Sequence, residues 1–347
     1  MQTKEILVTG YEKVVQAELA PGVTSIIAVH NTNLGPSLGG CRFFDYHSFE
    51  DALTDALRLS EGMSYKSAMA GLPLGGGKAV IIGDPTLKKS PEVFQQFAEF
   101  VNSLEGKYIT AKDVGIELED LAQMAKHTEL IRGTDAPGSS GDPSPMTAFG
   151  VYRGLQASAQ HKWGNASLKD KKIIIQGLGH VGYDTAKYLT EEGATIYATE
   201  MNSEIMDRAV NELGINPLGL DDWQNIEADI FCPCAMGAIL NKQTLPRLAA
   251  NGIQIVAGGA NNQLHKPQTD GARLREAKIL YAPDYVINAG GIINIACEFG
   301  GYSVEKAKNK TTKIYDTLLE IYARAEKESR CTALVSLQIA KERLGIA

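Results

Sequence analysis

The chain has 347 residues, 44% of them apolar, which is enough for about two domains that each bury a core. Acidic residues outnumber basic ones, 41 to 34, and no run is rich in lysine and arginine, so we expect no nucleic-acid partner. The sequence shows neither an apolar run long enough to span a membrane nor the pattern of a signal peptide, which predicts a cytoplasmic protein with no membrane partner. The five scattered cysteines favour reduced thiols, and the pair Cys232 and Cys234 has no second pair at zinc-like spacing, so we expect no metal site.

The first part of the chain predicts a mixed α/β lobe. Short β-branched runs at 24–31 and 78–83 are typical of strands, and the helical spacing of 48–63 follows Ser48, a good N-cap residue. The stretch "PLGGGKAV" (73–80), at the start of the second run, places three glycines directly before Lys78. Because glycines cost conformational entropy, we expect the backbone there to approach another group very closely.

A stretch of turn-forming residues at 133–145 predicts a hinge. Beyond it, short apolar strands alternate with helical patterns, which indicates a doubly wound parallel sheet. The tail from about 304 to 345 reads as two more helices. The predicted fold class is therefore α/β with two lobes and a cleft between them: 1–135 as a substrate-binding and catalytic domain, 136–325 as a Rossmann domain, and 326–347 as a C-terminal helix that packs back across the lobes.

The motif "GLGHVG" (177–182) predicts the cofactor of the second lobe. It follows the strand-like "KKIIIQ", begins a helical pattern, and is followed by Glu200 at the end of the next predicted strand. In this arrangement the first glycine makes the turn, the second admits a pyrophosphate, and the third lets helix and strand pack. Glu200 would accept hydrogen bonds from the ribose hydroxyls and repel the 2′-phosphate of NADP, which favours NAD.

Several longer motifs resemble those of the amino-acid dehydrogenases, the superfamily of glutamate, leucine, phenylalanine and valine dehydrogenases, with the leucine enzymes as the nearest branch. The resemblance covers nearly the whole chain and is carried by "LGPSLGGCR", "DALRLSEGMSYKSAMAGLPLGGGKAVI", "YITAKDVG", "GSSGDPSPMTAFGVYRG", "QGLGHVG", "GGANNQL" and "YAPDYVINAGGIIN". It implies an oxidoreductase that removes the amino group of an L-amino acid, works with a nicotinamide cofactor, and forms a homo-oligomer.

The resemblance also implies roles for individual residues. Lys78 would be the catalytic lysine, Asp113 its acid/base partner, and Lys66 the group that binds the substrate carboxylate. The residues expected near the substrate are Leu38, Gly39, Gly40, Asn262, Ile292 and Ile295. Those expected near the cofactor are Arg42, Thr147, Gly177, Leu178, Gly179, His180, Val181, Gly182, Glu200, Asn262 and Asn288.

The chemistry of oxidative deamination fits these residue types, because removal of a hydride from an amine-bearing carbon needs a fixed carboxylate and groups that move protons. Leu38 and Ile295 match positions that hold the distal carboxylate in glutamate dehydrogenases. An apolar pair cannot compensate for the desolvation of a carboxylate, so we expect leucine, isoleucine and valine as substrates. The leucine enzymes usually have alanine where this chain has Gly77, which keeps phenylalanine or tryptophan open. Two other classes stay open as well: an NAD-binding regulator without catalysis, and a hydroxy-acid dehydrogenase.

Overall fold

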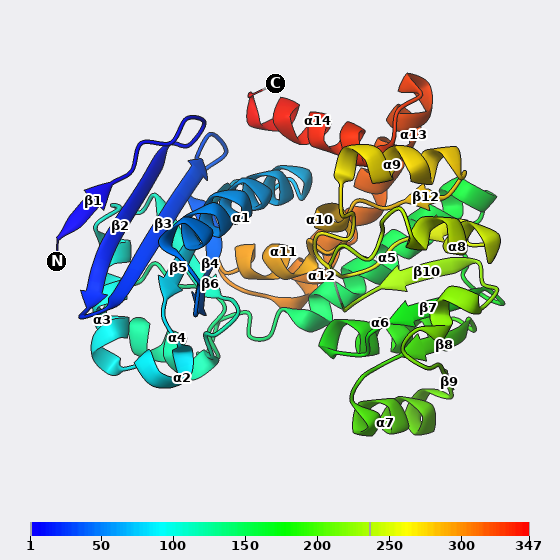
Figure 1. Cartoon of the computed structure of the whole chain (residues 1–347), viewed down its shortest axis with the longest axis horizontal. Helices are drawn as coiled ribbons and strands as arrows, with labels where there is room; N and C mark the ends of the chain where they lie inside the picture. Colours follow the sequence, from blue (N-terminus) through cyan, green and yellow to red (C-terminus); the bar gives the residue numbers. More distant parts are fainter. Residues whose placement is uncertain (1, 236, 347) are drawn as a thin grey trace. The chain divides into compact units, whose positions relative to one another are not determined.

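The computed structural model describes residues 2–235 and 237–346. The chain folds into two compact units, each of mixed α/β type, which Figure 1 shows with their elements labelled. Unit 1 consists of Met1–Asp142, Ile295–Ser303 and Ala340–Ala347, and unit 2 of Pro143–Asn294 and Val304–Ile339. The predicted α/β class with a Rossmann-type lobe is confirmed. The exact domain limits and the cleft stay predictions.

Unit 1 is built on a six-stranded sheet in the order β1-β2-β3-β5-β4-β6. The strands are β1 (Thr3–Glu5), β2 (Lys13–Ala20), β3 (Val23–Asn31), β4 (Ser37–Phe44), β5 (Gly75–Ile82) and β6 (Tyr108–Lys112). The first three strands and β5 pair antiparallel, whereas β4 runs parallel to both β5 and β6. The strands predicted at 24–31 and 78–83 are confirmed as β3 and β5.

Helices cover both faces of this sheet. Helix α1 (Phe49–Met69) packs on one face, and α3 (Pro91–Asn102) and α4 (Leu118–Met124) pack on the other, with the short α2 (Pro85–Lys88) between them in sequence. Neighbouring Ile26 and Ile27 are both fully buried on opposite faces, as the two-residue period of a strand requires. The predicted N-cap is confirmed, because Ser48 Oγ accepts a hydrogen bond of 3.0 Å from the Asp51 amide.

The glycine run belongs to β5 rather than preceding it, and glycine is required there because neighbouring protein atoms leave no room for a Cβ. None of Gly75, Gly76 and Gly77 has positive φ. A Cβ at Gly76 would lie 2.1 Å from the Ser64 backbone nitrogen of α1, and one at Gly75 would lie 1.9 Å from the Asn31 carbonyl oxygen. The close approach expected from the sequence is therefore that of α1 and β3 to β5.

Unit 2 contains the predicted doubly wound sheet. Its strand order is β12-β11-β10-β7-β8-β9, and every pairing is parallel. The strands are β7 (Lys172–Gln176), β8 (Thr195–Thr199), β9 (Asn216–Pro217), β10 (Ile230–Pro233), β11 (Ile255–Val256) and β12 (Leu280–Tyr281). The sequence analysis missed β9, which is only two residues long and has no apolar run.

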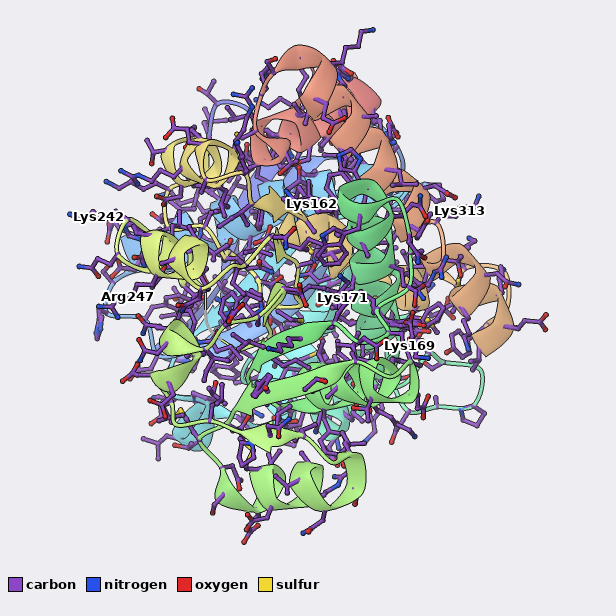
Figure 2. All side chains as sticks on the ribbon, turned by 90° about the vertical axis from the view of Figure 1, so that its right-hand side faces the viewer. Lys162, Lys169, Lys171, Lys242, Arg247 and Lys313 are labelled. Atoms are coloured by element: carbon purple, nitrogen blue, oxygen red, sulfur yellow. The ribbon has the colours of Figure 1, made fainter. Side chains whose placement is uncertain are left out.

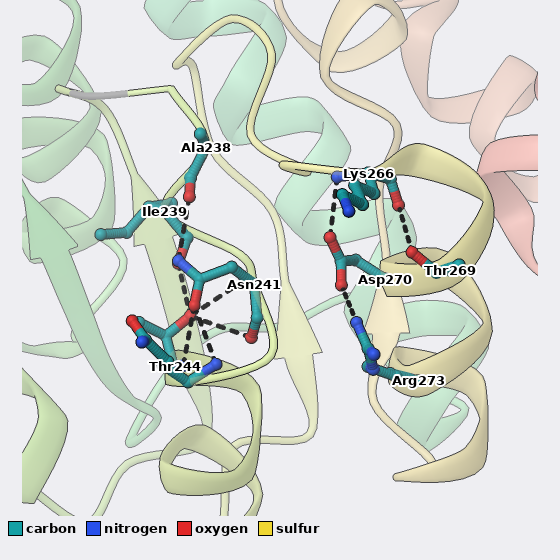
Figure 3. Close-up of polar contacts among 9 residues, drawn as sticks. Ala238, Ile239, Asn241, Thr244, Lys266, Thr269, Asp270 and Arg273 are labelled. Atoms are coloured by element: carbon teal, nitrogen blue, oxygen red, sulfur yellow. Dashed lines mark hydrogen bonds and ion pairs between the residues drawn. The ribbon is translucent and has the colours of Figure 1, made fainter.

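Most helices of unit 2 follow a strand. Helix α5 (Ser144–Trp163) precedes β7, and before the tail there follow α6 (His180–Glu191), α7 (Ser203–Leu213), the 3₁₀ turn η1 (Asp222–Asn225), α8 (Thr244–Ala250), α9 (Pro267–Glu276), α10 (Asp284–Ile287) and α11 (Gly290–Ala296), whose last two residues lie in unit 1. Side chains within and just before α8 and α9 stabilise their starts (Figure 3). Asn241 Oδ1 accepts from the Thr244 amide at 3.2 Å, and the buried Asp270 accepts from the Lys266 amide at 2.7 Å and pairs with Arg273.

The tail contains three helices, so the expectation of two was wrong. They are α12 (Val304–Thr311), α13 (Ile314–Glu328) and α14 (Thr332–Leu344). The apolar pattern continues through 312–313, where the structure has a turn that separates α12 from α13. No helix within 2–235 and 237–346 is long and apolar enough to cross a membrane.

Candidate active site

The centre of the candidate site in unit 1 is an ion pair between Lys78 and Asp113. Lys78 lies on β5 and Asp113 directly follows β6, and the two strands flank β4. The lysine side chain is 7% exposed and the aspartate side chain 22%. Gly40 on β4 makes this arrangement possible, because a Cβ there would lie 2.8 Å from the Asp113 Cβ.

Two cations keep Asp113 ionised. Burial by itself would raise the pKa of Asp113, but the charges of Lys78 and Arg42 outweigh burial and hold the pKa below its ordinary value. Arg42 Nε lies 3.4 Å from Asp113, and Arg42 Nη1 donates to Asp55 at 2.7 Å. Tyr46 also donates to Asp55, at 2.7 Å. Arg42, expected near the cofactor, therefore also fixes the position of Asp113.

Gly39 is held in place from the other side of β4. A Cβ at Gly39 would lie 1.7 Å from the Gly77 carbonyl oxygen, so no other residue fits at this position. The fully buried Tyr108 donates its hydroxyl to the Gly39 carbonyl at 2.7 Å. The backbone of the predicted substrate-binding glycines is therefore fixed by packing and by one buried hydrogen bond.

Lys66 lies half-buried in the last turn of α1. That turn packs on β5, where Ser67 Oγ donates to the Gly75 carbonyl at 3.2 Å. On the same helix, Ser64 shares a hydrogen bond of 2.8 Å with the ring of His30 on β3. The same packing that requires Gly76 thus places the Lys66 turn against the strand that carries Lys78.

In unit 2, the three glycines of "GLGHVG" differ in their backbone conformation and in what surrounds them. Gly177 has φ +92°, a conformation that favours glycine. A Cβ at Gly182 would lie 2.0 Å from the Gly177 carbonyl oxygen, so the third glycine is needed for packing. At Gly179, the N-cap of α6, a Cβ would meet nothing within 4 Å. The start of α6 is thus open where a pyrophosphate would lie, and the loop fits a dinucleotide.

Glu200 lies against this loop. Its Oε2 accepts from the Leu178 amide at 2.7 Å, and its Oε1 accepts from the amides of Met201 and Asn202 at 2.8 and 3.0 Å. His180 and Val181 form the first turn of α6. The acidic residue expected at the ribose is therefore next to the glycine-rich loop, as parallel strands β7 and β8 require.

Asn288 supplies a second observation that fits a ligand. Its Nδ2 donates to Asn261 Oδ1 at 2.7 Å, while its buried Oδ1 has no hydrogen-bond partner among the described residues. An orphaned buried acceptor is costly unless a ligand donor satisfies it. Asn262, with φ +51°, accepts from the Ala238 amide at 2.7 Å through its own carbonyl. Both asparagines follow the carboxyl ends of parallel strands, where such folds bind ligands.

Thr147 lies in the first turn of α5, beside the paired glycines of "NAGG". Its hydroxyl donates to the Pro143 carbonyl at 3.0 Å. A Cβ at Gly291 would lie 2.9 Å from Thr147 Oγ1, and one at Gly290 would lie 2.1 Å from the Met146 carbonyl oxygen. These glycines therefore serve the packing of α11 on α5.

The apolar residues expected around the substrate side chain fall in both units. Leu38 on β4 is 1% exposed, and Ile295 of unit 1 lies next to Gly133, where a Cβ would be 3.7 Å from its side chain. Ile292 is a buried residue of unit 2. The predicted site residues thus divide between the units: Lys66, Lys78, Asp113 and Ile295 belong to unit 1, and the glycine-rich loop, Glu200, Asn288 and Ile292 belong to unit 2.

The sequence analysis did not find the residues that hold this machinery in place: Asp55, Tyr46, Tyr108 and Glu298. Glu298 Oε1 accepts from the amides of Gly133 and Ser140 at 3.0 and 2.7 Å and from Ser139 Oγ at 2.9 Å, so it organises the predicted hinge stretch. Glu298 is 158 residues from Ser140 in the sequence, and no local pattern links the two.

A cavity of about 380 Å³ in unit 2 lies away from these residues. Its lining includes His161, Lys162, Arg275 and Lys278, which lie in or just after the last turns of α5 and α9. Figure 2 labels Lys162 on this face, where its ammonium donates to the Lys278 carbonyl at 2.7 Å. Because cations are favoured at helix C-termini, Lys162 and Arg275 have a structural reason to lie there. The cavity is at the amino end of β12, so it is not the predicted cofactor site.

Cys232 and Cys234, the pair considered as metal ligands, lie at the end of β10 with their sulfurs 3.7 Å apart. Both are free thiols. In the part of the chain that the structure describes, no three His, Cys, Asp or Glu side chains are grouped as metal ligands would be.

Unit 1 contains a buried lysine–aspartate pair, and unit 2 has the parallel sheet and glycine-rich loop typical of dinucleotide-binding oxidoreductases. Residues 12–130 match the family model "Glu/Leu/Phe/Val dehydrogenase, dimerisation domain", and 138–216 and 200–340 match "Glutamate/Leucine/Phenylalanine/Valine dehydrogenase". The chain belongs to this family and is an amino-acid dehydrogenase, an oxidoreductase acting on the CH–NH₂ group of its donor. The family is NAD(P)-dependent.

The chain is 47% identical to the leucine dehydrogenase of Geobacillus stearothermophilus over 324 residues, which is 93% of this chain and 87% of that protein. It is 43% identical to the valine dehydrogenase of Streptomyces coelicolor over 344 residues, 97% and 93% of the two chains. Among solved structures, the L-tryptophan dehydrogenase from Nostoc punctiforme matches with a TM-score of 0.86 and 38% identity, over 97% of this chain and 96% of that one.

Proposed function

We propose that this protein catalyses the NAD-dependent, reversible oxidative deamination of leucine, isoleucine and valine to the 2-oxo acid and ammonia. The observation that carries the proposal is the buried Lys78–Asp113 pair above Gly40, in a chain that belongs to the amino-acid dehydrogenase family. The protein acts as a homo-oligomer in the cytoplasm. Support for the oligomer is the match of 12–130 to a model described as a dimerisation domain.

The residues of unit 1 divide the chemistry among them. Lys66, a compact positive charge, binds the substrate carboxylate and orients the amine-bearing carbon. Asp113 is ionised at neutral pH, because its pKa is lowered by Lys78 and Arg42 in spite of burial, so it accepts a proton from the substrate ammonium group. Lys78 must first give up the proton of its ammonium; it then activates the water that attacks the iminium carbon by taking a proton from it, and it exchanges protons with Asp113 through their contact.

The hydride that leaves the amine-bearing carbon would be taken up by NAD, which supplies this redox chemistry when bound. The open N-terminus of α6 at Gly179 and the neighbouring Glu200 would hold its pyrophosphate and its adenosine ribose. The negative charge of Glu200 disfavours a 2′-phosphate, which supports NAD over NADP. Asn288 offers its unpaired Oδ1 to a ligand N–H. Thr147 and Asn262 lie at the same edge of unit 2.

The preference for aliphatic substrates is supported by Leu38 and Ile295, which offer no partner for a distal carboxylate. The 47% identity to a leucine dehydrogenase agrees with it. A specific observation favours the alternative of phenylalanine or tryptophan: the chain is also 45% identical to a phenylalanine dehydrogenase of Caldalkalibacillus thermarum and 38% identical to the tryptophan enzyme. One methylene changes discrimination by only about 1–3 kcal/mol, so several aliphatic substrates are expected.

The test is a panel of kcat/KM values for L-amino acids with NAD, followed by the absorbance of the reduced cofactor and by ammonia release. Leucine, isoleucine and valine should rank highest. Phenylalanine or tryptophan above leucine by about tenfold would reverse the ranking, and glutamate as best substrate would overturn the pocket argument. NAD binding without turnover of any amino acid would favour the alternative of an NAD-binding regulator without catalysis.

The role of Lys78 is tested with Lys78→Ala against Lys112→Ala, an exposed lysine beside Asp113 that pairs with Glu117 at 3.0 Å. Lys78→Ala should lower kcat by about 10²- to 10⁴-fold while NAD binding persists. Lys112→Ala should stay within about twofold of the unchanged enzyme. Activity of Lys78→Ala within about tenfold of the unchanged enzyme would remove Lys78 from the mechanism.

A further inference from the structure

The end of α14 contacts the turn of α1 that carries Lys66. Arg343 Nη1 donates to the carbonyl oxygens of Ala68 and Met69 at 3.2 and 3.1 Å, across 275 and 274 residues of sequence. These carbonyls belong to the last turn of α1, where a helix leaves its final C=O groups without intrahelical partners. A guanidinium at this end also complements the helix dipole.

The other carbonyls of this turn are satisfied locally. Lys66 O accepts from the Ala70 amide and Ser67 O from the Leu72 amide, both at 3.0 Å, and Ala68 O accepts from the Gly71 amide at 3.2 Å as well as from Arg343. Among the described residues, the hydrogen bond to Met69 O comes from Arg343. The final geometry of the turn therefore depends on a side chain from the far end of the chain.

A second contact joins the same C-terminal residues to the loop before β4. Asn33 Nδ2 donates to the Leu344 carbonyl at 2.8 Å. The loop of Asn33 leads into β4, which carries Leu38, Gly39 and Gly40. Residues 340–346 thus contact two segments of unit 1, the end of α1 and the loop before β4, which are 30 residues or more apart in sequence.

We infer that Arg343 is a positioning residue for the substrate carboxylate, which acts by fixing the α1 turn that carries Lys66. This inference rests on the proposed role of Lys66. Loss of Arg343 lets the last turn of α1 fray, and Lys66 then samples positions in which it does not meet the carboxylate. The cost falls on substrate binding, because the contacts of Arg343 with Ala68 O and Met69 O are to the turn that carries Lys66.

The experiment compares Arg343→Ala, Arg343→Lys, Lys66→Gln and the double variant, with Arg330→Ala as the matched control. Arg330 is an arginine near the start of α14 that pairs with Glu328 at 2.9 Å. In Arg343→Ala, the KM for leucine and for the 2-oxo acid should rise about tenfold, with kcat and the KM for NAD within about twofold. Arg343→Lys should be intermediate, and added guanidinium should restore part of the KM of Arg343→Ala. Arg330→Ala should leave all of these constants unchanged.

The double variant decides whether Arg343 acts through Lys66. If it does, Arg343→Ala adds little to the KM of Lys66→Gln, because the two changes are not independent. A multiplied KM in the double variant would overturn the inference, as would a lowered Tm of Arg343→Ala with unchanged KM. If Lys66→Gln leaves KM unchanged, the proposed role of Lys66 fails separately, and the inference fails with it. The substrate panel still tests the reaction itself.

Discussion

Gly77 offers a sharp test of how β5 is packed. A Cβ at this position would lie 2.6 Å from Tyr108 Cδ2 and 2.7 Å from Ser37 Oγ. Neither neighbour can move easily. The Tyr108 ring is fully buried and its hydroxyl is bonded to Gly39, while Ser37 Oγ donates to the Lys107 carbonyl at 2.6 Å. Gly77→Ala should therefore strain the sheet beneath the candidate site.

The magnitude follows from two opposed effects. Replacing a strand glycine by alanine gains about 0.4–1 kcal/mol, because the unfolded chain loses freedom. Inserting a methyl group into a packed core costs about 1–3 kcal/mol. The clash is below the distance that real Cβ atoms show, so the cost prevails and we expect a net loss of about 1–2 kcal/mol in the free energy of unfolding of unit 1. Because Tyr108 also holds the Gly39 carbonyl, the KM for the amino acid should rise.

The assay is hydrogen exchange of peptides that cover 75–82, together with thermal unfolding, since both tryptophans lie in unit 2 and do not report on unit 1. Gly62→Ala is the control: a Cβ in that helical position meets nothing within 4 Å, so the change should stabilise by about 0.8–1 kcal/mol. In a Tyr108→Val background, Gly77→Ala should cost at least about 1 kcal/mol less. A neutral or stabilising Gly77→Ala, or the same cost in both backgrounds, would refute this reasoning.

Three further predictions follow from single side chains. Burial lowers the pKa of His30 below 6.5, although the charges of Glu61 and Glu12 act to raise it. Because the neutral ring is the form favoured in the folded state, its contribution to the free energy of unfolding is present above pH 6.5 and is lost as the pH falls below that value. His30→Gln should therefore flatten the dependence of the unfolding midpoint between about pH 7.5 and 5.5, and equal slopes would contradict this. Glu200→Gln should raise kcat/KM for NADP relative to NAD by about tenfold or more, which steady-state kinetics with both cofactors will measure, and an unchanged ratio would exclude Glu200 as the determinant. Glu298→Ala should lower the free energy of local opening of residues 133–141 by about 1–3 kcal/mol, which should speed hydrogen exchange and proteolysis there. Unchanged protection of 133–141 would show that Glu298 does not hold this stretch.

The sequence by itself was sufficient for features that depend on neighbouring residues. The Ser48 cap and the strand, turn and helix around "GLGHVG" were both predicted, because caps, turns and periodicity act within a few residues. The family resemblance pointed to Lys78 and Asp113, and the structure brings these two side chains into contact. Their catalytic roles stay predictions.

Only the tertiary structure decided why the glycines are where they are and what fixes the site. The sequence predicted a close approach at Gly75–Gly77 without identifying its partners, which the structure shows to be Asn31, Ser64 and Tyr108. The contacts of Glu298 with Ser140 and of Arg343 with Met69 join segments 158 and 274 residues apart. Such contacts leave no periodic pattern in one sequence, since they depend on how sheets and helices pack, and packing is set by the shapes of residues that are distant along the chain.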